Sequence, residues 1–272
     1  MSKLIEVENL SIHTESKNTL VGGVDFELNH NEIVGVFGES GSGKTITVKS
    51  LIGVLGQELD VTTDAHTILG QDFKSYSGQA YRALLGKHIG YIAQNTTAYL
   101  HPLIRIKNQI TEAYITHGYG NKREALARAV SLMREVGLKD PARVLESYPY
   151  EISGGMRQRV NIAMSLMTRP SIIIADEPTT ALDSITEQSV MRLLQKIRRE
   201  HNVSMIFITH NLKLIQYFTD RCYVLYEGNV VESGPTKWVF NSPQHAHTQL
   251  LVDLIPKYGA ARSEAKQVKV YS

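Results

Sequence analysis

An eight-residue segment near the N-terminus has the composition and spacing of a loop that binds phosphate groups. Residues 38–45 fit the pattern G-x-x-x-x-G-K-[ST] at every fixed position. An apolar run at 33–37 precedes them as a buried strand would, and residues 46–52 can continue as a helix. This context favours a nucleotide site over an accidental glycine-rich turn, because glycines let backbone N–H groups and a helix N-terminus face an anion. The predicted loop consists of Gly38, Glu39, Ser40, Gly41, Ser42, Gly43, Lys44 and Thr45.

Two residues of this loop have chemical roles of their own. Lys44 is expected to reach the β- and γ-phosphates of a nucleotide, and the Thr45 hydroxyl to hold Mg²⁺.

Two acids follow a second apolar run. Asp176 and Glu177 come directly after the predicted strand 172–175, at the strand end where open α/β sheets bind ligands. One acid there can hold Mg²⁺, directly or through water, and the next can polarise an attacking water molecule. Strand ends also carry acids that are merely solvated, so the pair indicates a metal and catalytic site only in combination with the phosphate loop.

A second helix N-terminus also has the features of an anion site. Ser153 is placed to cap the helix 156–168, and Gly154 and Gly155 leave its N–H groups open. An ordinary helix cap would look the same. Two anion sites for one nucleotide suggest that the second serves the nucleotide of a neighbouring copy.

Composition limits the class of protein. The 272 residues contain 29 Lys+Arg against 27 Asp+Glu, so no strong positive field indicates a nucleic-acid partner. The single cysteine, Cys222, excludes an internal disulfide framework and a cysteine-based metal cluster. Acids near the N-terminus argue against a signal peptide, and no apolar run approaches the roughly 18 residues that span a bilayer. We expect a soluble, cytosolic chain that reaches a membrane only through a partner.

The order of predicted elements indicates an α/β protein. Residues 4–37 alternate apolar and polar side chains, as half-buried antiparallel strands do. From about 96 to 168 the pattern becomes helical, with a capping box at Asn121 and Glu124 and a stop at Gly137. The methionines of this region are expected to pack in the core.

The second half alternates buried strands and a helix. The apolar runs 172–175 and 205–208 flank a charged amphipathic helix at 185–201, and a hairpin follows at 223–231. We therefore predict a parallel sheet interrupted by a helical insert.

Six motifs in a fixed order resemble the ATPase subunits of ABC transporters, and the resemblance covers nearly the whole chain. They are the phosphate loop 38–45, a Q-loop at Gln94, the signature 152–158, the Walker B segment 172–177, a D-loop at 180–183 and a switch His210. The resemblance implies a P-loop NTPase fold with a parallel-sheet core, an antiparallel β subdomain and a helical subdomain insert. It places an ABC ATPase domain at 1–240, with the helical subdomain at about 96–168, and a short C-terminal extension at 241–272.

The resemblance also implies a role for each matched residue. Thr45 and Gln94 would coordinate Mg²⁺, and Asp176 would hold the ion through its second shell. Glu177 would be the general base for water, and His210 would contact the γ-phosphate. The signature residues Ser153, Gly154 and Gly155 would close on the ATP of a partner subunit, while Asp183 bridges the two subunits.

Finer features are similar to the oligopeptide, dipeptide and nickel importer group. These are the form of the phosphate loop at 38–41, the Q-loop segment 94–102, the signature segment 153–164 and the C-terminal segment 242–251. They imply an ATP-hydrolysing subunit of a bacterial importer for peptides or a related solute, at the cytoplasmic face of the membrane. Its implied partners are two transmembrane permease subunits, a second and different ATPase and, indirectly, a solute-binding protein.

Three alternatives differ from this interpretation. A nickel or metal-chelate importer would differ only in its cargo. A non-transport ABC protein would carry two cassettes or long coiled coils, and an unrelated P-loop kinase would lack the signature and His210.

The chain departs from the family pattern in four places. Ile152 replaces the usual signature leucine, and Asn31 stands where most relatives have glycine. The aromatic residue that normally stacks on adenine is missing near position 14, where His13 and Thr14 stand, so His13 is the candidate base contact. The cysteine cluster of many longer relatives is also missing.

Overall fold

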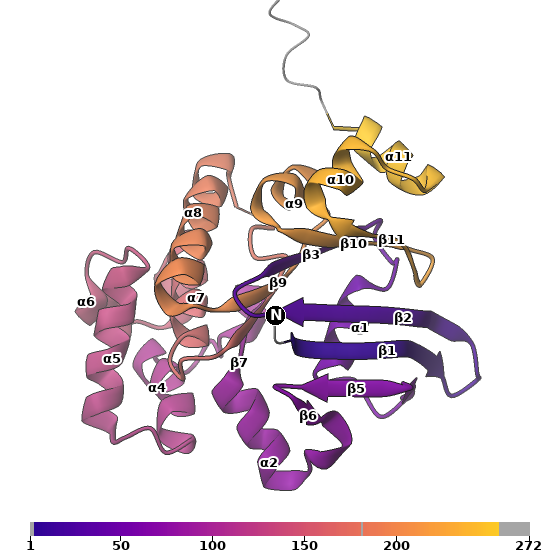
Figure 1. Cartoon of the computed structure of the whole chain (residues 1–272). Helices are drawn as coiled ribbons and strands as arrows, with labels where there is room; N and C mark the ends of the chain where they lie inside the picture. Colours follow the sequence, from indigo (N-terminus) through magenta and orange to yellow (C-terminus); the bar gives the residue numbers. More distant parts are fainter. Residues whose placement is uncertain (1–2, 181, 256–272) are drawn as a thin grey trace, which may run out of the picture.

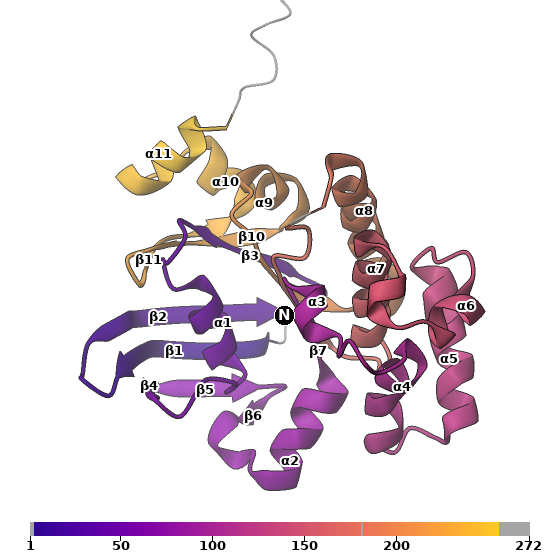
Figure 2. The ribbon, with the colours of Figure 1, turned by 180° about the vertical axis from the view of Figure 1, so that it is seen from behind.

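The strands form two separate sheets, with helices around them (Figure 1, Figure 2). The structure is a computed structural model that describes residues 3–180 and 182–255. The first sheet is antiparallel, with the order β2-β1-β5-β6 and with β4 also paired to β1. Its strands are β1 (Lys3–Thr14), β2 (Thr19–Asn29), β4 (Leu59–Thr62), β5 (Ala65–Ile68) and β6 (Gln71–Asp72).

The second sheet has the order β11-β10-β3-β9-β8-β7 and is parallel except for the β10–β11 hairpin. Every residue of β3, β8 and β9 is buried, as the unbroken apolar runs predicted. The strands are β3 (Ile33–Gly38), β7 (Ile89–Ile92), β8 (Ile172–Asp176), β9 (Ser204–Ile208), β10 (Arg221–Tyr226) and β11 (Asn229–Pro235).

This six-stranded sheet separates two hydrophobic cores, because successive side chains of a strand point to opposite faces. In β8, Ile172 and Ile174 pack into the core shared with the antiparallel sheet and with α1 (Lys44–Leu51). Ile173 and Ala175 pack into the other core, with the helices. The sheet is therefore covered on both faces.

Helices α3 to α7 lie between β7 and β8 in the sequence, and α4, α5 and α6 stand on the side of the molecule away from β1 and β2 (Figure 1). The predicted capping box is confirmed, because Asn121 and Glu124 exchange both cap bonds at the start of α5. Gly137 follows the end of α5 with φ +83°, as predicted. The helices are α3 (Thr96–Tyr99), α4 (Ile106–Thr116), α5 (Lys122–Glu135), α6 (Pro141–Glu146) and α7 (Gly154–Ser165).

Within the described residues four helices follow β8, and short elements fill the segment before β7. The four are α8 (Ser184–His201), α9 (Leu212–Phe218), α10 (Thr236–Asn241) and α11 (Ala246–Asp253). Before β7 come the 3-10 turn Phe73–Ser75, α2 (Gly78–Ala83) and the π-helical turn Leu84–His88, and a second 3-10 turn, Pro149–Glu151, precedes α7. Among residues 3–180 and 182–255 there is no helix with the length and hydrophobicity that crossing a bilayer requires.

Two of the sequence features have a structural explanation. Asn31 has φ +54°, a left-handed conformation that glycine adopts freely and asparagine tolerates. The start of the predicted C-terminal extension is attached to β11, because the Glu232 carboxylate accepts the backbone N–H groups of Gln244 at 2.9 Å and His245 at 3.0 Å. Residues 256–272 of the predicted extension lie outside the described residues.

Candidate active site

The phosphate loop joins the end of β3 to the start of α1. Gly38 passes so close to β10 that an added Cβ would lie 2.1 Å from the Leu225 carbonyl oxygen, so only glycine fits. Gly43 caps α1 with φ +96°. The loop conformation therefore depends on glycine at both positions.

Lys44 folds back over this loop. Its Nζ donates to the carbonyl oxygens of Gly38 at 3.0 Å and Glu39 at 2.6 Å, and the residue is only 7% exposed. Burial lowers the pKa of Lys44, while the carboxylates of Glu177 and Asp176 act in the opposite direction. The ammonium group is thus a buried positive charge beside the loop.

Asp176 ends β8 with its carboxylate turned toward α1 and β7. It is 5% exposed, its Oδ1 lies 3.5 Å from Thr45 Oγ1, and its Oδ2 accepts the Tyr91 hydroxyl at 2.7 Å. The next residue, Glu177, leaves the strand with φ +46°, and its N–H donates to the Ile208 carbonyl at 2.9 Å. That turn carries the second carboxylate away from the sheet and toward the loop.

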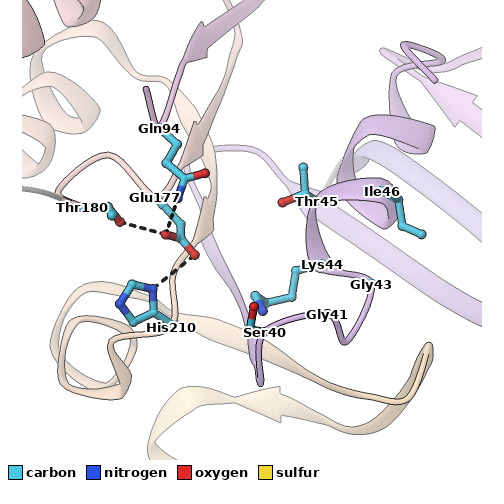
Figure 3. A pocket seen from close by; sticks show the side chains of 10 residues that line it. All are labelled: Ser40, Gly41, Gly43, Lys44, Thr45, Ile46, Gln94, Glu177, Thr180 and His210. Carbon is cyan, nitrogen blue, oxygen red and sulfur yellow. Dashed lines mark hydrogen bonds and ion pairs between the residues drawn. The ribbon is translucent and has the colours of Figure 1, made fainter. Parts of the chain in front are cut away.

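The Glu177 carboxylate is surrounded by three polar side chains (Figure 3). Oε2 accepts Gln94 Nε2 at 2.9 Å and Thr180 Oγ1 at 2.8 Å, and Oε1 lies 3.2 Å from His210 Nδ1. Gln94 follows β7, Thr180 follows β8 and His210 follows β9. The carboxyl ends of three neighbouring parallel strands therefore meet at this acid.

These groups line one cavity of about 670 Å³ between the loop and the strand ends. Glu177, Gln94 and His210 lie on one side of it and the loop on the other (Figure 3). Of the predicted site residues, the cavity is lined by Ser40, Gly41, Gly43, Lys44, Thr45, Gln94, Glu177 and His210. Ile46, which the sequence had not marked, and Thr180, the first residue of the predicted D-loop 180–183, also line it.

The signature residues lie elsewhere in this single chain. Ser153 caps α7, where its Oγ accepts the Met156 N–H at 3.3 Å. Gly154 lines a second cavity of about 470 Å³, which Gln94 also lines. None of Ser153, Gly154 and Gly155 lines the cavity at the phosphate loop.

Asp183 and His13 are also outside that cavity. Asp183 caps α8, and hydrogen bonds from the Thr186 side chain and backbone lower the pKa of its carboxyl group. His13 lies on β1, where its Nδ1 is 3.1 Å from the Thr19 hydroxyl oxygen. Ala181 of the predicted D-loop is outside the described residues.

The oxygen atoms at the loop suit a small, hard cation. The Thr45 hydroxyl and the Asp176 carboxylate face each other at 3.5 Å. Mg²⁺ is usually bound by a few protein oxygen atoms together with the phosphate oxygens of a substrate.

Comparison with known proteins decides the family. The ABC transporter family pattern matches residues 21–180, which is more than half of the chain. This protein belongs to the ABC transporter family. The dipeptide transport ATP-binding protein DppD of Escherichia coli is 36% identical over 94% of this chain and 79% of its own length. A putative peptide import ATP-binding protein of Brucella melitensis is 40% identical over 89% of this chain and 73% of its own length.

Solved structures agree with this ABC ATPase assignment. The bacterial ABC transporter cassette MJ0796, in its dimeric form, has a TM-score of 0.74 and 26% identity, over 85% of this chain and 98% of that one. The same cassette is known with ADP and Pi in a post-hydrolysis state. The protein cbiO1 of Clostridium perfringens, part of the ABC transporter complex cbiONQ, shares the fold, with a TM-score of 0.75, 22% identity and coverage of 89% of this chain and 92% of that chain. The predicted fold class and the ATPase assignment are thus confirmed.

Proposed function

We propose that this ABC ATPase binds MgATP at the 38–45 loop and hydrolyses it to drive the uptake of short peptides by a bacterial importer. The observation that carries the catalytic part is the position of Glu177. It is the only carboxylate among the residues that line the cavity, and it faces the loop that would hold the phosphates. A general base must stand within reach of the water molecule it activates.

In this proposal each neighbour of Glu177 has a separate task. Gln94 and Thr180 donate hydrogen bonds to Oε2 and so fix the direction of the carboxylate. His210, whose side chain is 62% exposed, is free to turn from Oε1 toward a γ-phosphate. Lys44 would exchange the loop carbonyls for phosphate oxygens, which are stronger acceptors for an ammonium group.

Thr45, Asp176 and Gln94 would hold Mg²⁺. Bound there, the ion would neutralise charge on the β- and γ-phosphates. Asp176 would contact the ion indirectly, because this residue is only 5% exposed and does not line the cavity.

The site is completed by a second subunit in this proposal. The signature residues of this chain do not line its own cavity, although they begin a helix whose first N–H groups suit an anion. They would close on the ATP of a second, different ATPase, and Asp183 would lie at the interface between the two subunits. Two transmembrane permease subunits and, indirectly, a solute-binding protein would complete the importer, with this chain at the cytoplasmic face.

The names of two relatives support the proposed cargo. The Escherichia coli and Brucella melitensis proteins reported above are named for dipeptide and peptide transport, so peptides are favoured over nickel or a metal chelate. In this proposal residues 1–240 are the ATPase domain and 241–272 the extension of the peptide-importer type.

The test is to isolate the native complex from membranes, identify its ATPase chains and reconstitute it in proteoliposomes. We expect two different ATPase chains and MgATP hydrolysis that increases with a peptide-loaded solute-binding protein. Two identical copies of this chain in an active transporter would refute the heterodimer. Stimulation by a nickel-loaded binding protein, and not by a peptide-loaded one, would refute the cargo.

A further inference from the structure

Tyr91 reaches the metal-site acid from the neighbouring strand. β7 and β8 pair in parallel with Tyr91 opposite Ile174. Asp176 lies two residues beyond Ile174 and therefore on the same face of β8. Two strand residues span roughly 6.6 Å, a distance that a tyrosine side chain can cover along the strand. The Tyr91 hydroxyl accordingly donates to Asp176 Oδ2 at 2.7 Å.

The carboxylate that receives this bond is buried. Asp176 is 5% exposed, and within the described part of the chain only the hydroxyls of Tyr91 and Thr45 are recorded as donors to its side chain. A buried ionised carboxylate is costly unless it is hydrogen-bonded. The 2.7 Å bond from Tyr91 is much shorter than the 3.5 Å approach of Thr45, so Tyr91 is the principal donor.

The position of the donor is fixed by its packing. Tyr91 lies, partly buried, against the core shared with the antiparallel sheet. Its phenol donates to Oδ2 of Asp176, so Oδ1 is the carboxylate oxygen left for the side of the phosphate loop.

We propose that Tyr91 is a positioning residue for the metal site, which locks Oδ2 of Asp176 so that Oδ1 stays turned toward Thr45. This inference rests on the Mg²⁺ part of the proposed function. It assigns a task to a side chain that precedes the Q-loop and does not itself line the nucleotide cavity. Without the phenol, Asp176 can rotate away from Thr45.

The experiment measures the binding of a fluorescent, non-hydrolysable ATP analogue at increasing Mg²⁺ concentration. For Tyr91→Phe we expect the half-saturating Mg²⁺ concentration to rise about tenfold, because groups that orient a metal ligand typically contribute 10–100-fold to affinity. Analogue binding in EDTA should not change. Tyr81→Phe is the matched control, since Tyr81 packs in the same core and its hydroxyl donates to the Ile52 carbonyl at 2.9 Å, away from the acid. It should titrate like the wild type.

A second pair of variants separates positioning from a general structural effect. If Tyr91 acts through Asp176, adding Tyr91→Phe to Asp176→Asn should not shift the Mg²⁺ titration further. A shift of less than about twofold for Tyr91→Phe alone, or independent shifts in the double variant, would overturn the inference. A wild-type protein whose analogue binding ignores Mg²⁺ would overturn the metal assignment itself, and this inference with it.

Discussion

Replacing Glu177 by glutamine should stop hydrolysis and leave nucleotide binding intact. The amide has nearly the same shape as the carboxylate and keeps one acceptor oxygen for the hydrogen bonds that Gln94 and Thr180 now donate at 2.9 Å and 2.8 Å. It cannot take a proton from water. The contacts of Lys44 with the phosphate loop do not involve Glu177.

The size of the effect follows from the role. A positioned general base contributes about 10²–10⁴-fold to the rate. At 1.36 kcal/mol for each factor of ten, this is about 2.7–5.4 kcal/mol of transition-state stabilisation. The substitution should lower the turnover rate and not the affinity for ATP, because the base acts on water and not on the bound nucleotide.

The assay is steady-state ATP turnover of the assembled transporter, with equilibrium binding of ATP to the same preparation. Glu200→Gln is the matched control, because it makes the same chemical change on an exposed face of α8, beside Lys196. It should keep full turnover. If Glu177→Gln retained more than about a tenth of the wild-type turnover, the loss would be too small for a general base and the assignment would be wrong.

Three further predictions concern other parts of the chain. If His13 replaces the missing aromatic residue, His13→Tyr should tighten ATP binding and His13→Ala should weaken it, since stacking on a base contributes about 1–3 kcal/mol; no change in binding for either variant would remove His13 from the site. Burial raises the pKa of Cys222 to about 12, so the thiol should stay protonated at neutral pH and react with a disulfide reagent only as fast as the protein unfolds; rapid labelling of the native chain would contradict this. Asn121→Ala removes the cap of α5 and should lower the free energy of unfolding by about 1 kcal/mol in a urea titration, whereas an unchanged midpoint and slope would show that the cap contributes nothing.

Local signals in the sequence were enough to predict the loop and the strand that carry the site residues. The phosphate loop needs glycine at Gly38 and Gly43 for reasons of backbone geometry, so its pattern could be recognised from residue types alone. The strand that ends at Asp176 was recognisable because it is buried on both faces and therefore continuously apolar.

The sequence could not reveal interactions that depend on how strands are paired. The bond from Tyr91 to Asp176 joins residues 85 positions apart and exists only because β7 lies beside β8 in one particular register. Thr180 belongs to the predicted D-loop, but its hydrogen bond to Glu177 could be seen only when the left-handed turn at Glu177 was known. No strand or helix was predicted for residues 56–88, because the short strands there gain their stability from pairing with β1 and with each other.

The most direct test of the central claim is the uptake of radiolabelled short peptides by cells that lack this chain. Uptake should be lost in these cells, restored by the wild-type chain, and not restored by an equal amount of the Lys44→Ala variant, which removes the buried ammonium group beside the phosphate loop. Equal peptide uptake with and without the chain would contradict the account.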